Sequence, residues 1–419
     1  AFVANAARGL RKGRTAEQGV GACAIAHFER GGVVELRVGI SWVSIGQARA
    51  AVERECGDRT FDAVRAAAAD RWEHYLERIR VDGGTPEERV LFYTFFTRLV
   101  CMPSDLGVDH ENPLWRSGVR QYNDLYCLWD SVRNANSLLM LIDPEQQASL
   151  LNALLDIAEH TGWLVDAWIA GHSAQVQGGS SADILFCEAF LKGLEGVAYE
   201  RALECMLKNS RVESPDPFLY GRYLPHYRDR GWVPDGVINC VSRHLEYSYQ
   251  DWCAARLAAG LNRRQDAEEA ARGARKVWNL WREDLKAFAP RRADGSWVEP
   301  FDPETCRPDS WNDPYFYEGP SVGWSFNVQH DFAGLVRRHG GPDAFARAID
   351  RFLARHSPCK EVFMHIPWLY HYAGAPARTA AAVWRTLHRE YSTRRDGLPD
   401  NEDMGCHSAF YICGALGLY

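Results

Sequence analysis

The chain has 419 residues, of which 46% are hydrophobic and 25% are charged. This composition is typical of a folded globular protein and argues against a disordered chain, and the length allows one large domain with appendages. The net charge of −7 is spread along the sequence and its basic pairs stand near acidic residues, so no nucleic-acid partner is expected. No apolar run reaches the roughly 18 to 20 residues that a membrane span needs.

The cysteines and the N-terminus carry the information on cellular location. The first residues, AFVANAARGLRKGRT, lack the apolar segment of a signal peptide. The 12 cysteines show no C-x-x-C pair and no zinc spacing, and several lie in apolar helical stretches where free buried thiols are expected, namely Cys187, Cys205, Cys253 and Cys413. This usage is compatible with the cytoplasm, and the location stays open.

The periodicity of apolar residues predicts a short β-rich start followed by helices. Residues 31–44 alternate apolar and polar positions, which predicts one or two strands. The helical period begins at Phe61, and Thr85, Pro86 and Glu88 form a capping box that starts a helix through Leu99. Further helices are expected at roughly 128–141, 143–160, 182–193, 197–209, 241–260, 264–286, 322–338, 342–355, 375–391 and 405–418.

The loops between these helices are alternately short and long. The long ones, at 161–181, 210–239, 290–320 and 357–374, exceed ordinary helix connections, and long loops on a regular scaffold usually carry function. About twelve helices joined in this way indicate a mainly α fold, an (α/α)6 barrel, with the long loops gathered at one mouth. The 15 Trp and 17 Tyr are typical of sugar-handling proteins, because pyranose rings stack on aromatic faces.

Glu318 lies on a loop among aromatic residues, including Tyr317 and Trp324. Aromatic surroundings desolvate a carboxylate and raise its pKa, which suits a general acid. A helix-capping or solvent-facing glutamate is the alternative.

Asn401, Glu402 and Asp403 stand at the start of the last expected helix. Acidic residues are favoured there by the helix dipole, so capping is one interpretation. Helix N–H groups would also keep a carboxylate ionised, as a general base requires, which is the other interpretation.

Asp130 and Arg133 follow an aromatic-rich loop, and Asp130 could accept hydrogen bonds from neighbouring sugar hydroxyls while Trp129 supplies a stacking face. A structural Asp–Arg pair at this helical spacing is the alternative. Glu246, Tyr247 and Asp251 recur on one helix face, for which a buried structural network is preferred.

Five stretches, in order and at compatible spacing over about residues 30–419, together resemble glycoside hydrolase family 92. No single motif carries the resemblance. The stretches are LWDSVR at 128–133, GGSSADILFCEAFLKG at 178–193, VSRHLEYSYQDW at 241–252, the segment 317–331 that begins with Tyr-Glu-Gly, and LPDNEDMGCHSAFYICGALGLY at 398–419.

The resemblance implies a calcium-dependent, inverting exo-α-mannosidase that removes terminal α-linked mannose, with α-1,2 linkages expected, from manno-oligosaccharides or glycoprotein N-glycans. By the same resemblance, Glu318 is the catalytic acid and Asp403 the base. Arg133, and Asn401 and Glu402 beside Asp403, are expected to bind substrate. An inverting (α/α)6 glycosidase for another sugar and a catalytically dead carbohydrate-binding relative are the alternatives.

The stretch KEVFMHIP at 360–367 is similar to the part of the family that surrounds the leaving-group subsite and its calcium. Lys360 and Val362 replace the usual residues, as Ser180-Ser181 do in the second stretch. Glu361 and Asp403 offer the oxygen ligands that calcium needs, and Glu361 is also expected to bind substrate. The linkage preference stays open.

The resemblance also divides the chain into domains. Residues 1–60 are expected to be the remnant of an N-terminal β-sandwich, residues 61–84 a linker helix and residues 85–419 the catalytic barrel. Most of the family's β-domain would then be missing, in a fragment or a reduced form. Members of the family are usually secreted or periplasmic.

Overall fold

The computed structural model describes residues 2–5, 9–12, 23–25, 28, 31–108, 111–174, 178–307 and 311–419. Two compact units are present, Ala1–Arg71 and Trp72–Tyr419. Their boundary falls inside helix α2 (Phe61–Leu76), so it coincides with neither predicted domain boundary, and the predicted division of the chain stays a prediction. No helix among the described residues is long and apolar enough to cross a membrane.

The first unit contains a small antiparallel sheet and a helix. Strand β1 (Phe2–Asn5) lies between β2 (Gly9–Lys12) and β3 (Cys23–Ile25). Helix α1 (Ile45–Glu55) begins after Ser44, whose hydroxyl accepts a hydrogen bond from the backbone N–H of Gln47 at 3.1 Å. This side-chain cap satisfies one of the N–H groups that the first turn of a helix leaves free.

The prediction of strands at residues 31–44 is wrong, because the structure has no strand there. Alternation makes a strand only when a neighbouring strand supplies the backbone hydrogen bonds, and no ladder among the described residues includes this segment. Its apolar side chains remain largely exposed, with Val38 at 70% and Ile40 at 80%.

The second unit is mainly helical, as predicted. The Thr85 capping box at the start of α3 is confirmed, with Glu88 N–H donating to the Thr85 hydroxyl at 3.2 Å. The α-helices are α3 (Pro86–Leu99), α4 (Leu128–Ser131), α5 (Ala135–Ile142), α6 (Pro144–Thr161), α7 (Ala182–Leu191), α8 (Tyr199–Arg211), α9 (Leu224–Arg230), α10 (Cys240–Gly260), α11 (Arg264–Ala274), α12 (Ser321–Trp324), α13 (Phe332–His339), α14 (Pro342–Arg355), α15 (Pro376–Glu390) and α16 (Cys406–Leu416).

Shorter elements connect these helices. They are the 3₁₀ helices η1 (Arg275–Leu280), η2 (Glu361–Phe363), η3 (Ile366–Ala373) and η4 (Asp403–Gly405), and the two-stranded pairs β4 (Ser104–Val108) with β5 (Arg120–Asn123), β6 (Trp168–Ile169) with β7 (His172–Ser173), and β8 (Trp281–Arg282) with β9 (Ala287–Phe288).

Three predicted helices are shorter or broken in the structure. The helix expected at 128–141 is divided into α4 and α5. The helix expected at 264–286 ends at Ala274 and continues as η1 and the β8–β9 hairpin, whose aromatic residues Trp281 and Phe288 pack edge to face. The helix expected at 322–338 is divided into α12 and α13, because Asp331 caps α13 by accepting the backbone N–H of Gly334 at 2.8 Å.

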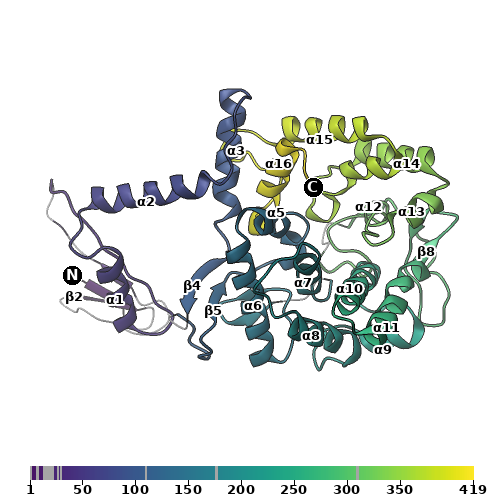
Figure 1. The fold of residues 1–419 in the computed structure, drawn as a ribbon, viewed down its shortest axis with the longest axis horizontal. Helices are drawn as coiled ribbons and strands as arrows, with labels where there is room; N and C mark the ends of the chain where they lie inside the picture. Colours follow the sequence, from purple (N-terminus) through teal and green to yellow (C-terminus); the bar gives the residue numbers. More distant parts are fainter. Residues whose placement is uncertain are drawn as a thin grey trace. The chain divides into compact units, whose positions relative to one another are not determined.

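Helices of the second unit contact one another around a ring (Figure 1). Helix α16 contacts α3, α5 and α15, α5 contacts α7, α7 contacts α10, and η3 contacts α13, α14 and α15. Three clusters of buried apolar side chains fill the space between these elements. The loops and short helical segments between the long helices carry most of the side chains described next.

Candidate active site

Glu318 lies on the loop that precedes α12. Its backbone has a φ of 57°, in the left-handed region that residues with a side chain rarely adopt. The loop is held in place at Tyr317, whose carbonyl accepts a hydrogen bond from Trp324 Nε1 at 2.7 Å. The residue after Glu318, Gly319, faces the Phe363 ring. A Cβ atom on residue 319 would lie 2.4 Å from that ring, so no larger residue fits without a shift. This strained position is therefore fixed by the packing around it.

Asp130 lies in the short helix α4 and is 1% exposed. Carboxylate oxygens of Asp130, Glu318 and Glu361 all lie within 4.8 Å of one another. A second group with the same spacing joins Asp130 to Asp403 and to the thiol of Cys127. Asp130 is thus a neighbour of both predicted catalytic residues, which are 85 positions apart in the sequence.

Two oxygens of this carboxylate cluster are buried without a hydrogen-bond partner among the described residues, Asp130 Oδ1 and Glu318 Oε2. Buried polar atoms in native proteins are nearly always paired, and unpaired ones mark a place for a ligand, an ion or a water molecule. A bound ion, ligand or water molecule would explain these two unpaired oxygens.

Burial and mutual repulsion raise the pKa values of these acids. Burial, followed by the charge of Glu361, raises the pKa of Glu318 to about 7. Burial and Glu361 likewise raise the pKa of Asp403 to about 6. Burial and Glu318 raise the pKa of Asp130 well above its ordinary value. Near neutral pH, Glu318 can hold a proton while Asp403 is mostly ionised, which suits a general acid and a general base.

The interpretation that helix N–H groups keep Asp403 ionised is wrong. In the structure, Glu402 takes that place, accepting the backbone N–H of Ser408 at 3.1 Å and the Ser408 hydroxyl at 2.5 Å at the start of α16. Asp403 is one residue further on, in η4, and its pKa rises instead of falling. Asn401 is exposed beside it.

Glu361 is held by a residue that the sequence analysis did not single out. Its Oε1 lies 2.8 Å from Nε2 of His407, and both side chains are buried. His407 stands in the last of the five stretches that carry the family resemblance, but 46 positions separate it from Glu361. The only signal in the sequence is a histidine inside an apolar helical run.

Arg133 does not pair with Asp130, so the alternative of a local Asp–Arg pair is wrong. Its guanidinium donates to Glu246 at 3.1 Å, and both side chains are more than nine-tenths buried. Asp251 belongs to the predicted structural network, since Arg222 donates to it at 2.6 Å and Tyr227 at 2.9 Å. Arg133 still lies close enough to lower the pKa of both Asp130 and Glu318.

Trp129 and Lys360 border the carboxylate cluster. Trp129 is 5% exposed and packs edge to face against Trp311, with ring centroids 6.2 Å apart. Little of its ring is therefore free to stack on a sugar. The ammonium group of Lys360 pairs with Asp400 at 2.6 Å and lowers the pKa of Glu318.

The carboxylates fit a hard cation. Asp130, Glu318 and Glu361 offer only oxygen ligands, which calcium and magnesium prefer. The second group includes Cys127. Burial raises the pKa of its thiol and so keeps the thiol protonated, and a protonated thiol is a poor metal ligand. The unpartnered Oδ1 of Asp130 is consistent with a bound cation.

Comparison with known proteins places this chain in a family. The sequence profile of the glycosyl hydrolase family 92 catalytic domain matches residues 47–419. A curated protein of Arthroderma benhamiae, described as an uncharacterized secreted glycosidase, is 26% identical over 422 residues, covering 92% of this chain and 51% of that protein. The chain belongs to glycosyl hydrolase family 92.

Solved structures agree. A family GH92 inverting mannosidase from Bacteroides thetaiotaomicron VPI-5482 superposes with a TM-score of 0.82 at 25% identity, over 90% of this chain and 55% of that one. A family GH92 α-mannosidase from Bacteroides thetaiotaomicron in complex with mannoimidazole gives a TM-score of 0.80 at 25% identity, over 89% and 52%. The predicted (α/α)6 barrel is confirmed. The chain spans about half the length of these relatives.

Proposed function

We propose that this chain hydrolyses terminal α-mannosides by single displacement, with inversion at the anomeric carbon. The observation that carries the proposal is Glu318, a buried carboxyl group with a pKa near 7 and an unpartnered oxygen, within 4.8 Å of Asp130 and Glu361 oxygens. Membership of the family and its similarity to mannosidases support the choice of sugar.

In the proposed mechanism, Glu318 gives its proton to the glycosidic oxygen as the bond to the anomeric carbon breaks. Asp403 accepts a proton from the water that attacks the opposite face, so the released mannose has the β configuration. The ordering of the two pKa values, about 7 for Glu318 and about 6 for Asp403, matches these roles. Asp130 lies between them and accepts hydrogen bonds from sugar hydroxyls.

The remaining predicted binding residues take supporting roles in this proposal. Trp129 precedes Asp130 in α4 and packs against Trp311, and Arg133 follows α4 and binds Glu246, so both support Asp130 in the proposed active site. Asn401 is exposed and could reach a substrate from the rim. Glu402 is bound to Ser408 and contributes by holding the segment that carries Asp403.

Calcium is the proposed metal, with Glu361 and Asp403 as ligands and Asp130 adjacent to both. When bound, the cation would offset the repulsion between these carboxylates and attract hydroxyl oxygens of the sugar. Glu318 must keep its proton to act as the acid, so we assign it no part in holding the metal. His407 would orient Glu361 toward the site.

The proposed substrates are manno-oligosaccharides or N-glycans with terminal α-1,2-linked mannose. The test is incubation of the purified protein with mannobioses of each α linkage, followed by proton NMR of the first mannose released. Release of β-mannose supports the proposal, and early release of α-mannose contradicts inversion. Hydrolysis only of aryl glycosides of another sugar would favour a different specificity, and binding without turnover would favour a carbohydrate-binding relative.

A further inference from the structure

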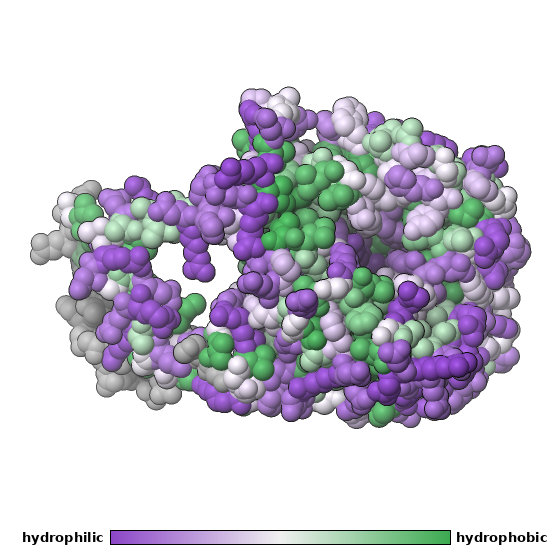
Figure 2. Space-filling model, in the orientation of Figure 1, coloured by the Kyte–Doolittle hydropathy of each residue, from purple (hydrophilic) through white to green (hydrophobic). Residues whose placement is uncertain are grey.

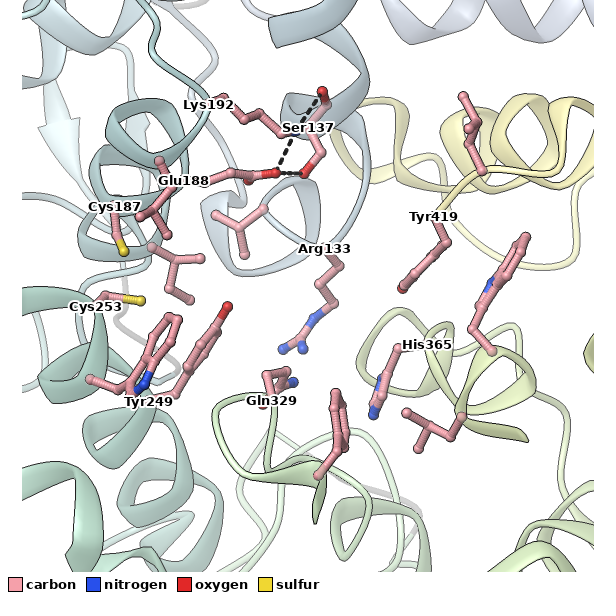
Figure 3. Close-up of a pocket in the computed structure, with 18 of the residues that line it drawn as sticks. Arg133, Ser137, Cys187, Glu188, Lys192, Tyr249, Cys253, Gln329, His365 and Tyr419 are labelled. Atoms are coloured by element: carbon pink, nitrogen blue, oxygen red, sulfur yellow. Dashed lines mark hydrogen bonds and ion pairs between the residues drawn. The ribbon is translucent and has the colours of Figure 1, made fainter. Parts of the chain in front are cut away.

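A cavity of about 750 Å³ lies inside the second unit. Arg133 lines it, but none of Asp130, Glu318, Glu361 and Asp403 does. Figure 2 shows a hollow in the surface of the second unit, with apolar residues on its rim. Figure 3 shows Arg133 pointing into the space between Tyr249 and His365. The volume is within the range of roughly 300 to 1,000 Å³ found for small-molecule sites.

Aromatic side chains form much of the wall of this cavity. Tyr249 and Trp252 are stacked with ring centroids 6.1 Å apart, and across the cavity Trp368 and Tyr419 are stacked at 5.1 Å. Flat aromatic faces favour contact with the C–H faces of sugar rings, which are flat and only weakly polar on one side. Such faces alone would also suit an apolar ligand, so the polar groups decide between the two.

The charged groups of the cavity cancel in pairs. Arg133 binds Glu246 at 3.1 Å, and Lys192 binds Glu188 at 2.7 Å, beside Ser137, which donates to Glu188 at 2.5 Å (Figure 3). Burial lowers the pKa of His365 to about 3, so this ring is neutral. A lining with balanced charges favours a neutral ligand over an anion or a cation.

Hydrogen-bond donors remain unused in the wall. Arg133 Nε and Trp368 Nε1 are buried and have no partner among the described residues. Arg133 is itself more than nine-tenths buried, and a guanidinium has five N–H donors. Gln329 lines the same space, and its amide nitrogen donates one of its two N–H groups to Asn327 at 2.9 Å. A neutral ligand rich in hydroxyl oxygens would satisfy these donors, and an apolar ligand would not.

We propose that this cavity is a second sugar-binding site, which holds a neutral mono- or disaccharide unit without cleaving it. Cleavage is not expected, because its two glutamates, Glu188 and Glu246, are each paired with a cation and so do not form a free acid and base. The proposal rests on the cavity alone and does not require the chemistry proposed for Glu318.

The test is equilibrium dialysis of the full chain with labelled D-mannose, combined with crystals soaked in the same sugar. We expect two moles of mannose per mole of chain, with one ring in the cavity. Trp252→Ala should raise the dissociation constant for mannose at one of the two sites at least tenfold. The matched control is Trp384→Ala on α15, because Trp384 is exposed and does not line the cavity.

Gln329→Leu is the second variant, which keeps the test valid if Trp252→Ala fails to fold. A wild-type chain that holds no mannose in the cavity, or a cavity site that both variants leave unchanged, overturns the proposal. Hydrolysis of mannosides is measured on the same proteins. A wild-type chain that hydrolyses mannosides but holds no mannose in the cavity contradicts this inference alone. An inactive wild-type chain that binds mannose in the cavity contradicts only the proposed function.

Discussion

Nε2 of His407 lies 2.8 Å from Oε1 of Glu361, and neither side chain reaches the surface. Glu361 also has a carboxylate oxygen within 4.8 Å of oxygens of Asp130 and Glu318. A residue that holds a ligand in one orientation often contributes nearly as much to a site as the ligand itself. His407 is therefore expected to be a positioning residue for Glu361.

His407→Met should lower kcat/KM on an α-mannoside by roughly 10- to 100-fold, because Glu361 loses the partner that fixes its orientation. The calcium concentration for half-maximal activity should rise in the same variant, which a purely structural role would not produce. His388→Gln, at an exposed position, is the control and should match the wild type. Unchanged activity and calcium dependence in His407→Met would remove His407 from the site.

Asp130→Ala should raise KM and lower kcat together, with a loss of several kcal/mol in kcat/KM. The reason is that Asp130 is adjacent to Glu318, Glu361 and Asp403, and its hydrogen bonds to sugar should strengthen in the transition state. Steady-state kinetics and a melting curve on the same sample separate this effect from unfolding. A folded variant with the wild-type kcat/KM would assign Asp130 to structure.

The sequence was a good guide wherever the determinant is local. The Thr85 capping box is complete within four residues, and the structure has it. The strands expected at 31–44 required a partner strand, which no local pattern can provide, and the segment is irregular. The helix expected at 264–286 likewise ends at Ala274, and the chain continues into the β8–β9 hairpin, in which two separate strands pair.

The candidate site shows the same division between local and distant determinants. Glu318 and Asp403 were paired in the prediction only through the family resemblance, since 85 positions separate them. Arg133 was paired with Asp130 as a local alternative, but a buried glutamate 113 positions away competes better for it. His407 was missed, because only the folded barrel brings its ring to Glu361.

Removal of metal should abolish activity, and calcium should restore it better than zinc. Asp130, Glu361 and Asp403 are hard oxygen ligands, and the thiol near them, Cys127, is held protonated by burial. The measurement is hydrolysis in excess chelator, followed by addition of each ion in turn. Full activity in excess chelator would take the metal out of the mechanism.

The two proposed catalytic carboxylates should respond differently to neutralisation. Glu318→Gln should retain most activity on a substrate with a fluoride leaving group, which needs no proton, and lose roughly 100-fold or more on an alkyl mannoside. Asp403→Asn should fail on both, because water must always be activated. A Glu318→Gln variant that loses as much activity on the fluoride as on the alkyl mannoside, as Asp403→Asn should, would contradict the assigned roles.

Glu318 should reduce the stability of the protein at alkaline pH. Its pKa is about 7 in the folded chain, above the ordinary value of 4.5, so the folded state binds the proton more tightly than the unfolded state does. The stabilising contribution is therefore complete below about pH 4.5 and is lost as the pH rises through about 7. Glu318→Gln, which cannot ionise, should be more stable than the wild type at pH 8 by roughly 1 to 3 kcal/mol.

Chemical denaturation in chelator, at pH 4 and at pH 8, measures this difference. The two proteins should have nearly equal free energies of unfolding at pH 4 and separate at pH 8. Glu402→Gln is the matched control, because its carboxylate accepts two hydrogen bonds from Ser408, and weakening them should lower stability by roughly 1 kcal/mol. A Glu318→Gln protein that is no more stable than the wild type at pH 8 would show that burial and Glu361 do not strain this carboxylate, and the case for Glu318 as the acid would lose its physical basis.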